Sequence, residues 1–239
     1  MEELIIFLII AFFTSILAGA FGFGTAIILI PIASFFFEIK KAIAILTIMF
    51  ISINLSQIWY FWRHVDWKLV SYMLVGAIPA VVIGAFLMII LPSELLKRVL
   101  GFVILFYIIN EFFKIFKNVK LSKPMISVVS FFYGFFSGIV GTGDSIKSSL
   151  LIHLGYTKEK FIVIMGITAL VMNIIKTLIF SKFSLISLTD IPLIIILVFI
   201  AIIGTYVGRL FLKKISPKLF RNAILGMLTI ISFKLIIFP

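Results

Sequence analysis

Long apolar stretches separated by short charged connectors run through the whole chain. The connectors hold most of the Lys, Arg, Asp and Glu residues, and the apolar stretches between them are close to 20 residues long. A transmembrane helix needs about 20 consecutive, mostly apolar residues. The pattern therefore predicts six ordinary transmembrane helices, at 42–62, 69–90, 99–116, 161–180, 191–212 and 219–237.

Two further apolar regions, 4–37 and 125–152, do not fit this pattern. Each is too long for one helix and too short for two comfortable ones, and each is interrupted by glycines, in GAFGFGT (19–25) and GIVGTGD (138–144). Glycine is a poor helix former, and irregular backbone at membrane depth is tolerated where it is buried in protein or lines a polar cavity. The breaks therefore predict such a cavity, with glycine for close helix packing as the alternative.

The two halves of the chain resemble each other. When Gly22 is aligned with Gly141, a shift of 119 positions, other residues fall into register: Gly19 with Gly138, Asn54 with Asn173 and Gln57 with Lys176. Further on, PSELLKRVLG (92–101) matches PKLFRNAILG (217–226), and AVVIG (80–84) matches GTYVG (204–208) as small-xxx-small packing signals. We expect one transmembrane domain built from two repeats, 1–119 and 120–239. Each repeat has an interrupted, broken or re-entrant helical segment plus three transmembrane helices.

Composition and charge place this all-α chain in the membrane. Hydrophobic residues make up 63% of it and charged residues 13%, with a mean hydropathy of +1.33. The net charge of +12 lies mostly in the connectors, as the positive-inside rule expects, and nucleic acid is not an expected partner. If the halves are inverted, the two faces carry 13 and 6 basic residues, against 11 and 8 for parallel halves. The stronger asymmetry favours inverted repeats.

Soluble-enzyme chemistry finds no support in the residues. The absence of cysteine excludes disulfides and thiolate metal sites, and with two histidines in the chain we expect no catalytic metal site. GIVGTGDS (138–145) has the glycine spacing of a phosphate-binding loop, but Asp144 occupies its lysine position. We expect no enzymatic activity, no metal and no cofactor.

Each interrupted segment combines a glycine turn with a short helix that follows it. The free N–H groups and the positive dipole end of such a helix point back at the turn, where an anion is favoured. Two such turns near the midplane are a recurring arrangement in transporters built from repeats. Substrate-binding candidates in the turns and the residues after them are Gly22, Gly24, Thr25, Gly141, Thr142, Gly143 and Ser145.

Polar residues at membrane depth supply the remaining candidates. Asn54 and Gln57 share a helix face, as do their counterparts Asn173 and Lys176. A buried amide can simply hold helices together, but a lysine deep in a transmembrane helix is costly and marks a functional site. Lys147 is a second candidate for the anion and Asp144 for a coupled proton, with an internal Asp144–Lys147 salt bridge as the alternative.

The motifs together resemble the TauE/SafE family of sulfite exporters and related permeases. They are an AGxFGFGT segment near the N-terminus, WRHVDWK (62–68), the small-xxx-small pair and SGxxGTG in the second half, and the resemblance covers essentially the whole chain. It implies a bacterial or archaeal cytoplasmic-membrane transporter of sulfite, sulfonates or similar oxyanions. Asp144 stands where family members often have more glycine, and Leu150 stands where Pro31 lies in the first half.

The expected function is therefore secondary transport of a small sulfur-containing anion by alternating access, with protons as the expected coupling ion. An anion-selective channel and a non-transporting membrane subunit are the alternatives. The expected partners are the anion and the lipid bilayer, with a homodimer left open as the assembly.

Overall fold

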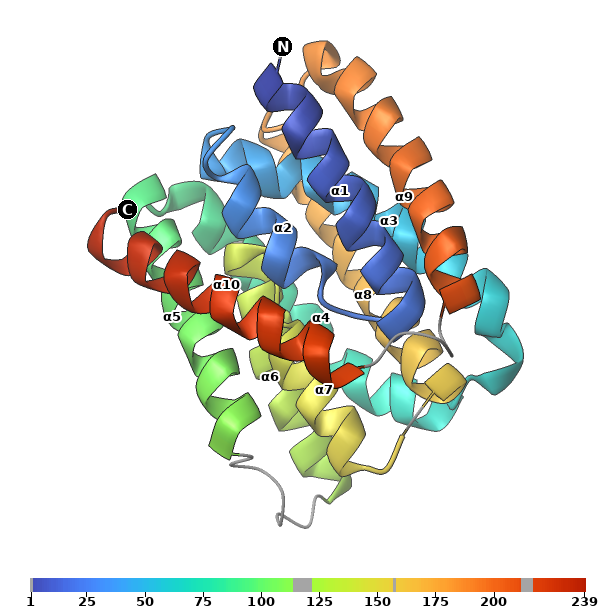
Figure 1. The fold of residues 1–239 in the computed structure, drawn as a ribbon. Helices are drawn as coiled ribbons and strands as arrows, with labels where there is room; N and C mark the ends of the chain where they lie inside the picture. The colour runs from blue at the N-terminus through green and yellow to red at the C-terminus, as the bar shows by residue number, and fades with distance from the viewer. Residues whose placement is uncertain (1, 114–121, 157, 212–216) are drawn as a thin grey trace.

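All regular structure in the described residues, 2–113, 122–156, 158–211 and 217–239 of the computed structural model, is helical (Figure 1). The first half begins with a long helix and a short one. Three long helices follow. Their bounds are α1 Glu2–Phe21, α2 Thr25–Ala33, α3 Ile39–Phe61, α4 Trp67–Ile90 and α5 Ser93–Phe113.

The second half repeats this order of long and short helices. Its bounds are α6 Lys123–Val140, α7 Asp144–His153, α8 Lys158–Lys182, α9 Ile191–Phe211 and α10 Pro217–Ile237, and short 3₁₀ turns, Trp62–His64 and Leu188–Asp190, precede α4 and α9. Both predicted breaks are present, since α1 ends just before Gly22 and α6 just before Gly141. Gly22 and Gly141 have the same left-handed φ of 81°, which glycine adopts without steric cost.

The first interrupted segment is a hairpin. The Thr25 hydroxyl at the start of α2 donates to the Thr14 carbonyl of α1, 3.1 Å away. After α2, the ring of Phe37 packs on that of Phe7, near the start of α1, with 5.2 Å between centroids. The chain therefore enters along α1 and returns along α2 to the side from which it came, as the blue helices show (Figure 1).

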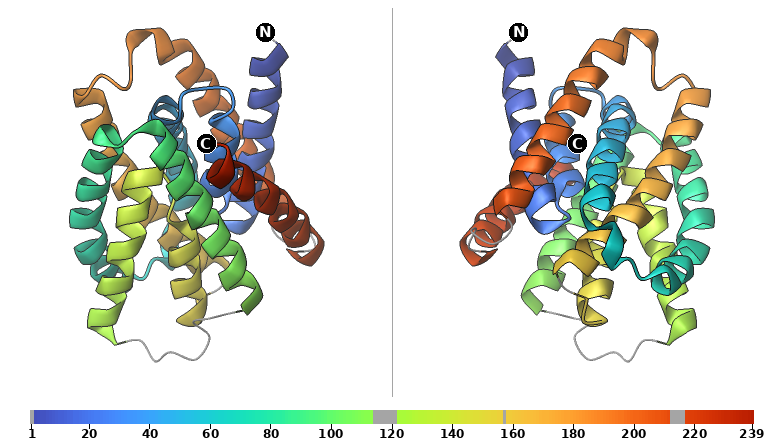
Figure 2. Two further views of the ribbon diagram at one scale, coloured as in Figure 1. Left: turned by 90° about the vertical axis from the view of Figure 1, so that its left-hand side faces the viewer. Right: turned by 90° about the vertical axis from the view of Figure 1, so that its right-hand side faces the viewer.

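The second interrupted segment is also a hairpin. Gly143, after the break, lies so close to α6 that a Cβ atom there would be 2.4 Å from the Tyr133 carbonyl oxygen. Val129, near the start of α6, and His153, at the end of α7, line the same pocket. The two views of Figure 2 show that α6 and α7 run side by side over the length of α7.

Five helical segments among the described residues are long and apolar enough to cross a membrane: Glu2–Phe21, Ile39–His64, Trp67–Ile90, Lys158–Lys182 and Leu188–Leu210. Four of them correspond to predicted spans. The fifth shows that α1 is a full-length helix, so in the first interrupted segment only α2 is short. The predicted spans 99–116 and 219–237 are not among the five, and residues 114–116 lie outside the described residues. Charges at Glu94, Lys97 and Arg98 make the start of α5 more polar.

Close packing of small residues joins the two halves. Helix α4 packs along α6 and α1 packs along α9. At Gly84 a Cβ would lie 2.4 Å from the Phe135 carbonyl oxygen of α6, and at Gly208 one would lie 2.0 Å from the Ile16 carbonyl oxygen of α1. Both glycines end the predicted small-xxx-small signals, which are therefore confirmed as helix-packing sites.

Gly76→Ala is expected to destabilise this packing. A Cβ at Gly76 would lie 1.9 Å from the Ser127 carbonyl oxygen, a backbone atom that cannot move alone. Overpacking of this kind costs about 1–3 kcal/mol or more, so the thermal unfolding midpoint in detergent falls. Gly226→Ala is the matched control, since no atom that the structure describes lies within 4 Å of the added methyl group. Equal midpoints for the two variants would contradict the close α4–α6 contact.

Candidate anion site

A small cavity of about 40 Å³ lies where the two hairpin turns meet α3 and α8. Its lining combines both turns with one polar face from each of these helices. Eight of the residues predicted from the sequence line it: Gly22, Thr25, Asn54, Gln57, Gly141, Asp144, Lys147 and Asn173. The structure thus brings together residues up to about 150 positions apart in the chain.

Lys147 is buried in the first turns of α7, with 1% of its surface exposed. Its ammonium group donates to the Tyr133 hydroxyl at 3.2 Å and to the Met165 carbonyl at 3.0 Å. The Asp144 carboxylate lies 3.5 Å away, so the salt bridge within α7, given above as the alternative, is present. The nitrogen also lies 4.5 Å from the Tyr133 ring centroid. A cation with this many partners is held in one place.

Lys176 is fully buried in α8, and its ammonium group donates to the Gly141 carbonyl at 3.4 Å. Within the described part of the chain, its nitrogen has no carboxylate at salt-bridge distance. Two buried ammonium groups therefore stand against the single carboxylate of Asp144. With both lysines protonated, this region carries one uncompensated positive charge, which is costly in a bilayer and favours an anion.

The backbone and amide groups around the cavity offer further donors. Gln57 donates through Nε2 to the Ala18 carbonyl at 2.9 Å, whereas the buried Nδ2 of Asn54 has no hydrogen-bond partner among the residues that the structure describes. The residues before α2 and α7, Gly24 and Gly143, cap their helices with no side-chain hydrogen bond. No side chain therefore caps the first N–H groups of either helix, and uncapped N–H groups of this kind can bind an anion.

The model of the sulfite exporter TauE/SafE family matches residues 7–235. The chain belongs to the TauE/SafE family. No curated protein and no solved structure matches it. The match covers both hairpins and all the helices that surround the cavity in this TauE/SafE protein.

The other predicted site residues of this TauE/SafE protein lie around the cavity, outside its lining. Lys176 and Gly143 contact lining residues, Gly141 and Tyr133. Gly24 precedes α2 with a φ of 101°, and Thr142 is buried with its hydroxyl unpartnered. Ser145 lines a different pocket, described below. Their roles in binding stay predictions.

Sequence reasoning missed several residues of the cavity. Tyr133, Ser137 and Met165 all line it, and Tyr133 is also a partner of Lys147. The repeat alignment held a signal for one of them, because a shift of 119 pairs Ser137 with Ala18, which lines the cavity as well. Extending that alignment into the first arm of each hairpin would have found this position.

Two contacts join the halves at the ends of the long helices, and we call them the end contacts. One is the hydrogen bond that the Tyr156 hydroxyl donates to Asp66, and the other is the ion pair of Lys41 with Asp190. Asp66 also accepts from the Leu69 N–H at the start of α4. The two contacts occupy equivalent places in the two halves. Asp66 and Asp190 each precede a long helix, α4 or α9, and each bonds a residue that follows the short helix of the other half.

The Asp66–Tyr156 contact makes stability depend on pH. The bond lowers the pKa of Asp66, while burial, followed by the bond to Asp66, raises the pKa of Tyr156 to about 12. A raised tyrosine pKa stabilises the fold fully below the ordinary value of 10.0 and loses this contribution as pH rises through about 12. A lowered aspartate pKa contributes above the ordinary value of 3.8 and is lost as pH falls below it.

Tyr156→Phe is therefore expected to lower the thermal unfolding midpoint at neutral pH. The difference from the original chain shrinks between about pH 10 and 12, because the tyrosine of the original chain then ionises. Differential scanning fluorimetry across a pH series measures both. A difference that stays constant up to pH values near 12 would show that the hydrogen bond does not hold the two connectors.

Proposed function

We propose that this TauE/SafE membrane protein transports a small sulfur-containing anion, with sulfite as the best fit, through the cavity between the hairpins. The observation that carries the proposal is the burial of two lysines, Lys147 and Lys176, in a region with one nearby carboxylate, that of Asp144. The unpartnered Asn54 amide and the open helix N-termini add neutral donors. This set suits an oxyanion, which accepts several hydrogen bonds at once.

The size of the cavity bears on the substrate. About 40 Å³ is on the scale of one or a few water molecules. A compact ion such as sulfite suits this space better than a bulky organosulfonate does. The cavity thus narrows the range of substrates that family membership implies.

Two inverted repeats, residues 1–119 and 120–239, are part of the proposal. The cavity supports them because equivalent positions line it in pairs: Ala18 with Ser137, Gly22 with Gly141, Thr25 with Asp144, Phe50 with Ala169 and Asn54 with Asn173. The hairpins support inversion, because a segment that returns to its starting side leaves an odd number of crossings, three, in each half. The positive-inside count points the same way, although five lysines that it includes, Lys114, Lys117, Lys120, Lys213 and Lys214, lie outside the described residues.

Alternating access is the proposed mechanism. The end contacts tie the two halves together, through Asp66 with Tyr156 and through Lys41 with Asp190. One repeat moving against the other would break one of these contacts at a time and open the cavity to one side. A channel would instead need a continuous pore past the site, so the paired contacts favour a carrier.

Protons are the proposed coupling ion and Asp144 their carrier. Its carboxylate lies beside Lys147 and lines the cavity, so protonation would add one positive charge where the anion binds. Proton and anion would then bind together. The proposed setting is the cell membrane of a bacterium or archaeon, and the proposed transport involves no enzymatic step. Whether the chain forms a homodimer is left open.

Counterflow in proteoliposomes tests the carrier. Vesicles of the purified chain loaded with unlabelled sulfite are expected to accumulate external ³⁵S-sulfite transiently above equilibrium, because an alternating site exchanges one ion for another. Empty vesicles carrying the protein and loaded vesicles without it are the controls. Equilibration without overshoot would indicate a channel, and no protein-dependent uptake of sulfite, sulfate, thiosulfate or sulfonates would contradict anion transport.

A further inference from the structure

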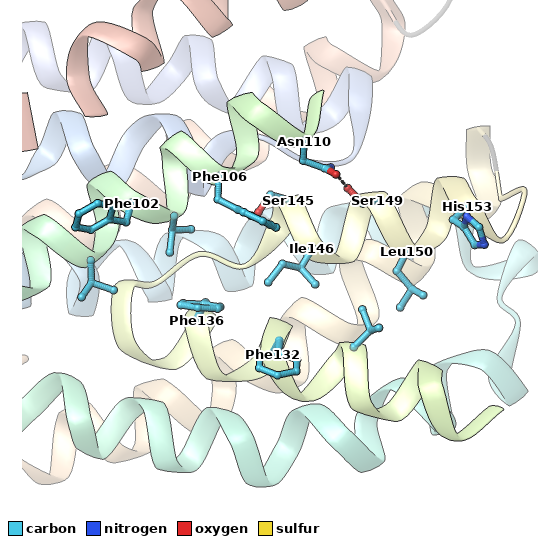
Figure 3. Close-up of a pocket in the computed structure, with 13 residues that line it drawn as sticks. Phe102, Phe106, Asn110, Phe132, Phe136, Ser145, Ile146, Ser149, Leu150 and His153 are labelled. Atoms are coloured by element: carbon cyan, nitrogen blue, oxygen red, sulfur yellow. Dashed lines mark hydrogen bonds between the residues drawn. The ribbon is translucent and has the colours of Figure 1, made fainter. Parts of the chain in front are cut away.

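A second, much larger cavity of about 570 Å³ lies between α5, α6 and α7 (Figure 3). This is within the range of pockets that enclose small-molecule ligands, about 300–1,000 Å³. It shares no lining residue with the anion cavity. Helix α7 separates the two, since Ser145, Ile146 and Ser149 face the large pocket whereas Asp144 and Lys147 line the small one.

Most of the wall is apolar, with four phenylalanines: Phe102, Phe106, Phe132 and Phe136. Phe102 and Phe132 are also 57% and 50% exposed on the outer surface of the helices. Because that surface meets lipid in a membrane protein, the pocket can be reached from the bilayer. Apart from His153 at one end, no titratable side chain lines it among the described residues, so the pocket suits an uncharged ligand.

Two buried polar atoms in this wall have no hydrogen-bond partner in the described part of the chain. The amide of Asn110 donates to the Ser149 hydroxyl at 2.8 Å, which leaves its Oδ1 atom unpaired. The Ser145 hydroxyl is also unpaired, and both residues are at least nine-tenths buried. Ser145 precedes Ser149 by one turn of α7, and Figure 3 shows Asn110, Ser145 and Ser149 on the same side of the pocket. An unpaired buried polar atom destabilises a fold, so a ligand group that bonds both would be favoured.

We propose that this pocket binds a neutral single-chain amphiphile from the membrane, with its hydroxyl group at Asn110 and Ser145 and its chain among the phenylalanines. A hydroxyl both donates and accepts, so it can donate to Asn110 Oδ1 and accept from Ser145. A carboxylate would only accept and would face the amide oxygen. This binding does not depend on the proposed transport function.

Photo-crosslinking in phosphatidylcholine liposomes tests the proposal. A long-chain alcohol with a diazirine on its chain is irradiated with the full-length protein, and peptides are mapped by mass spectrometry. Adducts are expected on the α5, α6 and α7 residues of the pocket. Unlabelled dodecanol is expected to compete at about tenfold lower concentration than dodecane, the ratio that one net hydrogen bond supplies. Adducts spread evenly over lipid-facing residues, or equal competition by dodecanol, dodecane and laurate, would overturn it.

Two variants sharpen the result. Ser145→Ala is expected to reduce the preference for dodecanol over dodecane, while its thermal unfolding midpoint without ligand stays equal or rises, because an unpaired buried hydroxyl is lost. Val103→Phe, which fills the pocket from α5, is expected to reduce crosslinking several-fold. Val75→Phe, at a 69% exposed site on α4, is the matched control and retains it. Full preference in Ser145→Ala would overturn the hydroxyl contact.

Discussion

Lys176→Met is expected to abolish sulfite counterflow while leaving a folded protein. The substitution keeps the apolar length of the side chain but removes one of the two buried ammonium groups. Lys147 and Asp144 then balance each other, and the excess positive charge is gone. Truncating one partner of a buried charged interaction costs about 2–5 kcal/mol, which corresponds to a loss of at least about 30-fold in kcat/KM.

The control for this variant is Lys182→Met, at the exposed end of the same helix α8. It makes the same chemical change far from the anion cavity, so counterflow is expected to persist. Thermal unfolding of both variants checks folding. The thermal unfolding midpoint should not fall for Lys176→Met, because a buried charge without a carboxylate partner is removed. Unchanged counterflow in a folded Lys176→Met protein would exclude Lys176 from the site.

Much of the fold could be predicted from the apolar pattern. Membrane helices satisfy their own backbone hydrogen bonds, so segment length and connector charges locate α3, α4, α8 and α9 well. The glycine breaks were also predictable, because a left-handed turn such as the one at Gly22 depends on the glycine itself, which adopts a positive φ without steric cost. The length of α1 was not, since nothing before Gly22 says whether the preceding helix is a half or a full crossing.

For the candidate site, the sequence predicted which residues take part better than it predicted where their side chains point. The internal duplication identified Asn54, Asn173 and Lys176 because polar groups recur where apolar ones are expected. The direction of side chains on a short helix depends on packing, however, and not on composition. Ser145 follows Asp144 directly, yet it faces the pocket on the other side of α7. Tyr133 gave no signal, because a tyrosine in an apolar helix is ordinary until a lysine such as Lys147 is placed beside it.

Asp144→Asn is expected to separate proton coupling from anion exchange. The amide keeps the size of the side chain but cannot carry a proton between the two sides. Proton-driven accumulation of sulfite in vesicles with a pH gradient is therefore lost. Counterflow without a gradient persists, because Lys147 and Lys176 both keep their charge and the excess positive charge rises by one. Parallel uptake assays with and without the gradient measure the two activities.

Asp66→Asn is the matched control, since it makes the same substitution in a connector, outside the anion cavity. It weakens an end contact and a helix cap, so it lowers stability while accumulation still follows the pH gradient. Asp144→Glu restores a titratable group and is expected to recover part of the coupling. If Asp144→Asn accumulates sulfite as the original chain does, the proton travels by another group. If it loses counterflow as well, Asp144 acts by positioning Lys147, because that lysine then lacks the carboxylate 3.5 Å from its nitrogen.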